Sequence, residues 1–156
     1  MELLDKKFLY PATVFASKSP TLVTTILGTC VAVCLFDPIS KIGGINHFML
    51  ASWDGNGLPS ARFGDRAMQQ LLERMQQLGA DRRSLQARVY GGLCRKSGGD
   101  HFNIGAKNIG MARSLLSQLQ IPVLTLDVGG RSPRKLAFQT HTGTVKIDLL
   151  LPEKIR

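Results

Sequence analysis

Two apolar runs separated by a turn place the tightest constraint on how this chain folds. The first run, Val31–Phe36, is β-branched and aromatic, which is typical of a buried strand. The segment Asp37-Pro38-Ile39-Ser40 follows, with Asp and Pro at the first two positions of a type I turn. A second apolar run extends from Lys41 to Met49. The pattern predicts an antiparallel hairpin in which Phe36 pairs with Lys41.

This hairpin sets one cysteine opposite one histidine. Counting back along the ladder from Phe36 and Lys41 pairs Cys30 with His47. Directly opposed residues have Cβ atoms about 4.5–5.5 Å apart, so a thiol and an imidazole at these positions would share a proton. A cysteine beside a histidine can become a thiolate nucleophile. We therefore expect Cys30 and His47 to form a catalytic pair.

The bulk properties favour one globular domain. The chain has 156 residues and 44% hydrophobic residues, and we expect a single domain over 1–156 with 1–20 as an N-terminal lead-in. The first residues are acidic and lack the apolar segment of a secretory signal. No run approaches the roughly 20 apolar residues of a membrane span. We expect a cytoplasmic protein that does not insert into a membrane.

Cysteine usage and charge narrow the function classes. Three cysteines suit a reducing compartment. On a strand Cys30 and Cys34 would lie about 13 Å apart, and His101 and His141 stand alone, so we expect no metal and no cofactor. The net charge is +9, but the basic residues are dispersed and aromatic residues are few. This composition argues against nucleic-acid binding. It leaves two alternatives, a basic face that attracts an acidic protein partner and a merely solvated surface.

Periodicity predicts two helices and about seven strands. One helix covers about 65–78 and ends at Gly79. The other carries an inner stripe of Ile109, Ala112, Leu115, Leu116 and Leu119. The strands, besides the two of the hairpin, are expected at 21–27, 85–90, 121–128, 135–139 and 144–151. We expect an α/β protein of the α+β type, with a mixed or antiparallel sheet core and helices outside.

An ordered set of short motifs gives the chain a family resemblance past Pro20. The motifs are Leu27-Gly28-Thr29-Cys30-Val31-Ala32-Val33, Asp37-Pro38, Gly43-Gly44, His47-Phe48-Met49-Leu50, Gly79-Ala80, Val89-Tyr90-Gly91-Gly92, Ile104-Gly105-Ala106-Lys107-Asn108, Asp127-Val128-Gly129-Gly130 and Thr142-Gly143-Thr144-Val145-Lys146. In this order they resemble the CheD family of chemoreceptor glutamine deamidases.

The resemblance implies a fold, an activity and a site. The implied fold is a β-sandwich-like core flanked by helices. The implied activity is hydrolysis of glutamine side-chain amides in chemotaxis receptors to glutamate, through a Cys–His thiolate and a thioester. The family's cysteine and histidine correspond to Cys30 and His47, and a threonine six residues before the cysteine corresponds to Thr24. A CheC-type phosphatase is the implied partner, and some members are methylesterases.

The third site residue depends on the connection before Cys30. A strict two-residue turn at Gly28-Thr29 would set Thr25 on the Cys30 face, whereas a longer loop or a bulge would set Thr24 there. We follow the resemblance and expect Thr24, with Thr25 as the alternative. Backbone N–H groups at Gly28, Thr29 and Cys30 are candidate oxyanion donors, and Gly28 would permit a positive φ.

Two other functions compete with deamidation. A Cys/His thiol hydrolase acting on other substrates, such as a methylesterase, would need the same catalytic pair. A non-enzymatic adaptor that binds receptors or a phosphatase through its basic surface would need neither Cys30 nor His47. The presence of both residues favours an enzyme.

Overall fold

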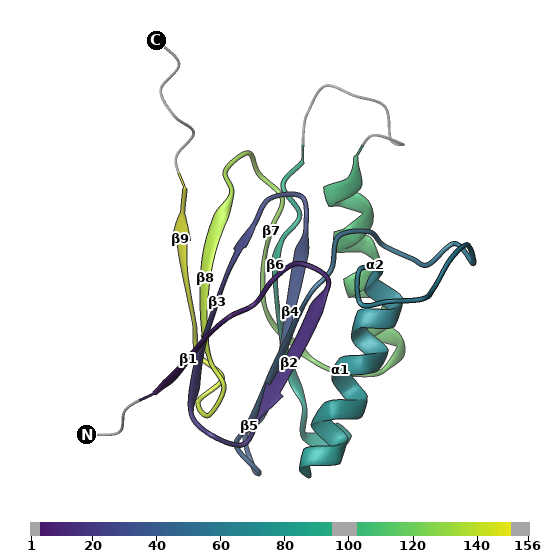
Figure 1. Ribbon diagram of the computed structural model, residues 1–156. Coiled ribbons are helices and arrows are strands. Elements are labelled where there is room, and N and C mark those ends of the chain that lie inside the picture. The colour runs from purple at the N-terminus through teal and green to yellow at the C-terminus, as the bar shows by residue number, and fades with distance from the viewer. Residues whose placement is uncertain (1–3, 95–102, 151–156) are drawn as a thin grey trace.

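The computed structural model describes residues 4–94 and 103–150 and shows three layers (Figure 1). The strands of the described residues are β1 (Asp5–Phe8), β2 (Thr13–Ser17), β3 (Thr21–Leu27), β4 (Val31–Asp37), β5 (Ile42–His47), β6 (Gln86–Gly91), β7 (Val123–Val128), β8 (Arg134–Gln139) and β9 (Val145–Leu149). The helices are α1 (Gly64–Leu78), α2 (Ile104–Gln118) and a 3₁₀ turn at Arg82–Ser84. No helix among the described residues is long and apolar enough to cross a membrane.

The strands form two sheets that pack face to face. The outer sheet has the order β1-β3-β8-β9, and the inner sheet has the order β2-β5-β4-β6-β7. The β1–β3 and β6–β7 pairs are parallel and the other pairs are antiparallel. Helices α1 and α2 cover the inner sheet on the side away from the outer sheet (Figure 1). The mixed, sandwich-like α+β fold expected from the sequence is confirmed.

Strand β4 is buried along its whole length because its two faces pack into two different cores. Val31, Val33 and Leu35 face the helices and pack with residues of α1 and α2. Ala32 and Cys34 face the outer sheet and pack between the sheets, together with Leu9, Val23, Leu27, Ile45, Tyr90, Leu136 and Phe138. A continuous apolar run is what a strand covered on both faces requires.

The connection from β3 to β4 is not a hairpin. Strand β3 pairs with β1 and β8 in the outer sheet, whereas β4 pairs with β5 and β6 in the inner sheet. The chain therefore crosses between layers at Gly28-Thr29, and the expected turn at these residues is wrong. Gly28 is also absent from the residues with positive φ, so the conformation expected for it is wrong as well.

The N-terminal segment supplies an edge strand to each sheet. Residues 1–20 were expected as a lead-in, but β1 lies in the outer sheet and β2 lies in the inner sheet. Leu9, between them, is 1% exposed. Its backbone N–H donates to the Thr24 carbonyl at 2.8 Å. This short segment thus joins the two layers beside β3.

The β4–β5 hairpin exists, but its register differs from the expected one by two residues. Phe36 pairs with Gly43 rather than with Lys41, and Asp37 pairs with Ile42. Lys41 adopts a φ of 58° and lies in the loop. The isolated bridge between Val31 and Phe48 continues the same register. A shift by two preserves the faces of both strands, so the error changes the pairing of Cys30 and His47 without changing their side of the sheet.

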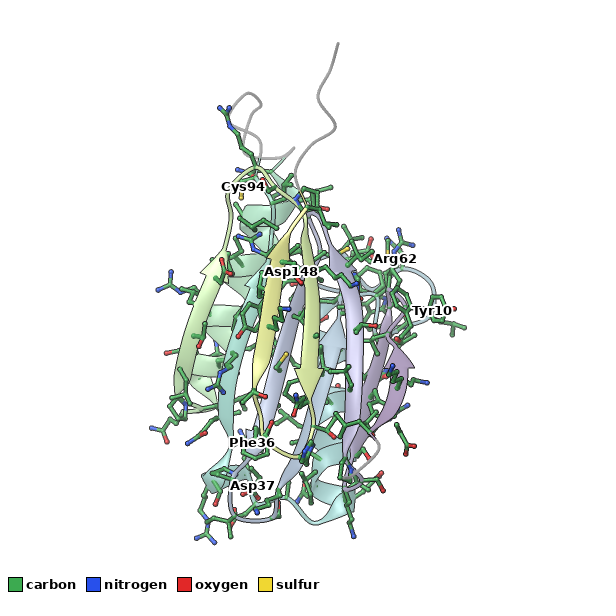
Figure 2. All side chains as sticks on the ribbon, turned by 90° about the vertical axis from the view of Figure 1, so that its left-hand side faces the viewer. Tyr10, Phe36, Asp37, Arg62, Cys94 and Asp148 are labelled. Atoms are coloured by element: carbon green, nitrogen blue, oxygen red, sulfur yellow. The ribbon has the colours of Figure 1, made fainter. Side chains whose placement is uncertain are left out.

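The Asp37 carboxylate holds this turn and thereby the register of the hairpin. Its Oδ1 accepts the N–H groups of Ile39 and Ser40 at 2.9 and 3.3 Å, and its Oδ2 accepts that of Asp81 at 2.9 Å. Asp37 is 1% exposed. Figure 2 shows it with Phe36 at the end of the sandwich opposite Cys94.

Asp37→Ala should therefore destabilise the fold. Its loss removes three part-buried hydrogen bonds to a carboxylate, each worth about 1.5–3 kcal/mol. Urea unfolding should report a lower free energy of unfolding for Asp37→Ala, while Asp148→Ala, at an exposed position, should stay close to the parent. Equal stability of the two variants would show that the carboxylate does not hold the turn.

Candidate active site

His47 is the last residue of β5 and lies in the layer between the two sheets. It is 2% exposed. The register of β4 and β5 sets it opposite Ala32, whose side chain packs between the sheets. Cys30 immediately precedes β4, two residues from Ala32, and packs against the same cluster. Cys30 and His47 thus share one face of the inner sheet, at diagonal rather than directly opposed positions.

Thr25, not Thr24, holds the histidine. The Thr25 Oγ1 lies 2.8 Å from the His47 Nδ1. Along β3, buried residues alternate with more exposed ones, and Thr25 is fully buried on the inward face. Thr24 lies on the outward face, where it lines a hollow of about 460 Å³ with Lys135 and Lys146. The expectation of Thr24 at this position is wrong, because adjacent strand residues point to opposite faces.

The Thr25 hydroxyl fixes the tautomer of the imidazole. It also lies 2.7 Å from the Leu9 carbonyl, which can only accept. Since a hydroxyl has one proton, Thr25 donates to Leu9 and accepts from His47. The His47 Nδ1 therefore carries the ring proton, and Nε2 carries the lone pair. A neutral imidazole in this tautomer is ready to act as a base through Nε2.

The Nε2 atom is buried and has no hydrogen-bond partner among the described residues. The Cys30 thiol and the imidazole are therefore not hydrogen-bonded to each other in this state. Burial raises the pKa of the Cys30 thiol, an effect that its own backbone N–H opposes. Burial also lowers the pKa of His47 to about 4. At neutral pH the resting pair is thus a thiol and a neutral imidazole, not the preformed thiolate that the sequence led us to expect.

The Cys30 segment is clamped by the loop after β6. The Gly92 N–H donates to the Cys30 carbonyl at 2.8 Å, and the Leu93 N–H donates to the Gly28 carbonyl at 2.9 Å. Gly91, with a φ of 104°, approaches so closely that a Cβ there would lie 2.3 Å from the Cys30 carbonyl oxygen. The clamp therefore depends on a glycine at position 91. Thr29 is exposed and Gly28 is half-buried beside Cys30.

The other cysteines and histidines lie in different surroundings. Cys34 is 2% exposed, and burial raises the pKa of its thiol. The Cys94 Sγ lies 3.0 Å from the Gly92 carbonyl oxygen. His141 is half-buried in the β8–β9 turn, and His101 falls outside the described residues. Within 4–94 and 103–150, no cluster of three or more His, Cys, Asp or Glu could hold a metal.

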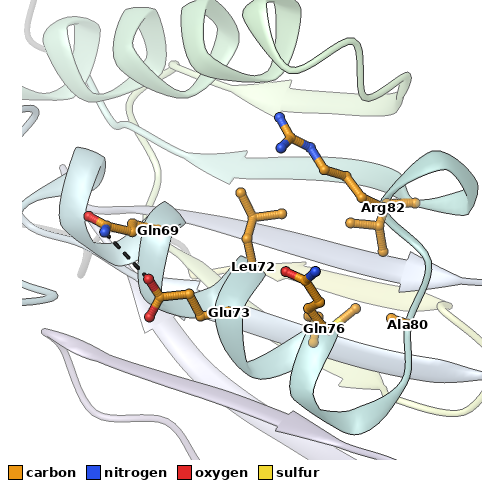
Figure 3. Close-up of a pocket in the computed structure, with 8 residues that line it drawn as sticks. Gln69, Leu72, Glu73, Gln76, Ala80 and Arg82 are labelled. Atoms are coloured by element: carbon orange, nitrogen blue, oxygen red, sulfur yellow. Dashed lines mark hydrogen bonds between the residues drawn. The ribbon is translucent and has the colours of Figure 1, made fainter.

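A hollow on the helix side of the inner sheet is separate from this pair. It has a volume of about 200 Å³ and lies between the C-terminal half of α1 and the segment that follows it (Figure 3). Its polar lining includes Gln69, Glu73 and Gln76, with Gln69 donating to Glu73 at 3.4 Å. No cysteine or histidine lines it. The Cys30–His47 pair, on the other face of the inner sheet, remains the candidate active site.

Comparisons with known proteins match the chain to one family. The model of the family described as "CheD chemotactic sensory transduction" matches residues 49–149. The "Probable chemoreceptor glutamine deamidase CheD" of Sulfurimonas denitrificans is 34% identical, over 92% of this chain and 93% of the relative. The chain belongs to the CheD family. The family-model match begins after His47, so it does not bear on the roles of Cys30 and His47.

Two further CheD relatives are similarly close. The "Probable chemoreceptor glutamine deamidase CheD" of Trichlorobacter lovleyi is 40% identical, over 91% of this chain and 89% of the relative. The "Probable chemoreceptor glutamine deamidase CheD 1" of Shewanella oneidensis is 42% identical, over 89% of this chain and 69% of the relative. The crystal structure of the Bacillus licheniformis hypothetical protein YfiH is 17% identical to this chain in sequence, with a TM-score of 0.48. The match covers 76% of this chain and 50% of that chain, and it is too weak to support a conclusion.

The tautomer of His47 can be tested directly. Thr25→Val should remove the acceptor of the Nδ1 proton, so the ring should redistribute between its two neutral tautomers. Long-range ¹H–¹⁵N spectra of ¹⁵N-histidine-labelled protein should show a protonated Nδ1 in the parent and in Thr24→Val, and averaged ring nitrogens in Thr25→Val. A protonated Nε2 in the parent would contradict the hydrogen-bond assignment.

Burial of His47 should also make stability depend on pH. Below its ordinary pKa of 6.5 the unfolded chain binds a proton that folded His47 takes up only near pH 4. Stability is therefore lost as pH falls from about 6.5 to about 4, by up to about 3 kcal/mol.

Urea unfolding across this range should show the slope in the parent and a smaller slope in His47→Gln. The control His141→Gln should keep the parent's slope. A parent whose stability is independent of pH over this range would contradict the burial of a neutral imidazole.

Proposed function

We propose that this protein is a glutamine deamidase that hydrolyses side-chain amides of chemotaxis receptors to glutamate. The observation that supports the proposal most strongly concerns the Nε2 atom of His47. This atom is buried without a hydrogen-bond partner among the described residues, and His47 shares one face of the inner sheet with Cys30. The names of the CheD relatives, which are chemoreceptor glutamine deamidases, supply the substrate class. A cytoplasmic location stays a prediction from the N-terminal residues and the cysteine usage, and a CheC-type phosphatase partner stays a prediction from the resemblance.

In the proposed reaction His47 acts as a base during attack rather than before it. The Cys30 thiol attacks the carboxamide carbon while Nε2 takes its proton, so an S–C bond forms and the carbonyl electrons move to oxygen. The imidazolium returns the proton to nitrogen, the C–N bond breaks and ammonia leaves. Thr25 stays hydrogen-bonded to Nδ1 and stabilises the charged ring. A neutral resting pair suits this concerted transfer.

The resulting thioester is hydrolysed by the reverse use of the same groups. Water approaches the acyl carbon, Nε2 takes a proton from it, and the S–C bond breaks as sulfur recovers that proton. The product is a glutamate side chain and the free thiol. Each tetrahedral intermediate carries an oxyanion, for which backbone N–H groups beside Cys30 are the proposed donors.

Cys30→Ala should abolish this reaction while leaving the fold intact. Purified protein would be incubated with the cytoplasmic fragment of a chemoreceptor, and peptide mass spectrometry would count glutamines converted to glutamate. His47→Ala should lose at least the roughly 10²–10⁴-fold typical of an acid–base group. Cys34→Ala, at a cysteine that faces the same core, is the matched control and should retain activity.

The outcomes separate the competing functions. Conversion of glutamine by Cys30→Ala would overturn the covalent mechanism. Release of methanol from methylated receptors, without glutamine conversion, would assign the pair to a methylesterase. Receptor binding by the parent with neither reaction would support the adaptor.

A further inference from the structure

One side chain ties the segment of the cysteine to the segment of the histidine. Asn108 lies on α2 and is fully buried. Its amide nitrogen donates to the Thr29 carbonyl and to the Met49 carbonyl, both at 3.0 Å. Thr29 directly precedes Cys30, and Met49 follows His47 by two residues. Both protons of the amide are thereby used.

The orientation of this amide is fixed by its two acceptors. A flipped amide would turn Oδ1 toward two carbonyl oxygens, which repel it. In the observed orientation Oδ1 is buried without a partner among the described residues. An unsatisfied buried acceptor is a cost that an apolar side chain would avoid. The residue at 108 is therefore better explained by what its two donors hold than by a contribution to packing alone.

Helix α2 reaches this position because glycines remove the steric barrier. A Cβ on Gly105 would lie 2.1 Å from the Leu93 carbonyl oxygen, and a Cβ on Gly92 would lie 2.4 Å from Ile109. Asn108 follows Gly105 by three residues, on the same side of the helix. The close approach of α2 to the loop after β6 therefore brings the Asn108 amide to the Cys30 segment.

Holding the Thr29 carbonyl also holds the N–H of Cys30. The two groups belong to one planar trans peptide unit and point in opposite directions. With the carbonyl drawn toward Asn108, the Cys30 N–H points away from α2. The sulfur of Cys30 belongs to the same residue as this N–H, which also opposes the rise in the pKa of the thiol that burial causes. An oxyanion formed by attack of that sulfur would lie within reach of it.

His47 does not depend on Asn108 for its position. The ring is held through Thr25 at 2.8 Å. The backbone after it is held by Phe48, which exchanges two hydrogen bonds with Val31 at 3.0 and 3.2 Å. The hydrogen bond to the Met49 carbonyl therefore fixes the Asn108 amide relative to the end of β5, and the same amide fixes the position of the Thr29 carbonyl.

We infer that Asn108 is a positioning residue that orients the Cys30 N–H as the oxyanion donor when the Cys30 thiol attacks an acyl carbon. The inference rests on the thiol chemistry proposed above. This role, unlike a purely structural one, should affect only some of the reactions of Cys30. Reactions of Cys30 that form an oxyanion should need Asn108, whereas reactions that form none should not.

The test compares two reagents on the same thiol, so it needs no receptor. With p-nitrophenyl acetate, the S–C bond forms through a tetrahedral oxyanion, the C–O bond breaks to release nitrophenolate, and His47 takes the thiol proton. With iodoacetamide, the sulfur displaces iodide directly and no oxyanion forms. Peptide mass spectrometry would measure the rate of each modification at Cys30 alone.

In Asn108→Leu the acylation rate should fall by about tenfold or more, up to the roughly 10²–10³-fold known for loss of an oxyanion donor. The alkylation rate should stay within about twofold of the parent, because alkylation forms no oxyanion that the Cys30 N–H could stabilise. Asn108→Asp has the same shape and cannot donate to both carbonyls, so it serves as the second variant if the leucine variant does not fold.

Asn103→Leu is the matched control. Asn103 caps the same helix by accepting the Ala106 N–H at 3.4 Å, and within the described part of the chain its side chain has no hydrogen bond with Thr29 or Met49. Its loss should lower the melting temperature while both rates at Cys30 stay at the parent values.

Two results would overturn the inference. Acylation at the parent rate in the Asn108 variants would mean that the N–H needs no such support. A parallel fall of acylation and alkylation would mean that Asn108 only maintains the structure around the thiol. The receptor assay remains independent: a selective loss of acylation together with no receptor deamidation would retain this inference and reject the proposed substrate.

Discussion

The hydrogen bond between Thr25 and His47 is the interaction on which the candidate site depends, because it joins the two sheets through the proposed catalytic base. Thr25 comes from the outer sheet and His47 comes from the inner sheet. The hydroxyl proton is committed to the Leu9 carbonyl, so the imidazole has only one way to satisfy Nδ1. The tautomer of His47, at the end of β5, is thus set by the backbone carbonyl of Leu9, near the start of the chain. The packing of the two layers and the chemistry of the site are inseparable here.

Sequence patterns predicted the elements after Pro20 well, missed β1 and β2, and predicted the partners of the strands less well. The apolar stripes of α1 and α2 and the apolar run of β4 follow from periodicity, which a single sequence contains. In β3, by contrast, Leu22 and Ile26 on one face are as apolar as Val23 and Leu27 on the other. Alternation therefore could not show which face is inward, and Thr24 and Thr25 could not be distinguished. The short link at Gly28-Thr29 resembles a hairpin turn locally, although it joins two sheets.

The pairing of Cys30 with His47 was correct in face and wrong in register, and the reason is a single loop residue. Lys41 adopts a left-handed conformation, which lysine rarely does and which its neighbours do not signal. The contribution of Leu9 could not be predicted either, because it acts through its backbone carbonyl. In the sequence, Asn108 stands out only as the last residue of the motif Ile104-Gly105-Ala106-Lys107-Asn108. Its role depends on two carbonyls that lie 79 and 59 positions away along the chain, and no local pattern contains such a relation.

The strand order has a consequence for when reactivity can arise during synthesis. Cys30 and His47 belong to the first third of the chain, but β3 is held in the outer sheet by β8, with Leu22 paired to Gln139. A chain emerging from the ribosome therefore carries the thiol and the imidazole long before Thr25 has a sheet to hold it. Domains with such distant pairings fold late and as a unit. An unfinished chain thus carries Cys30 without the buried surroundings of the proposed site, which form only when the last strands have docked.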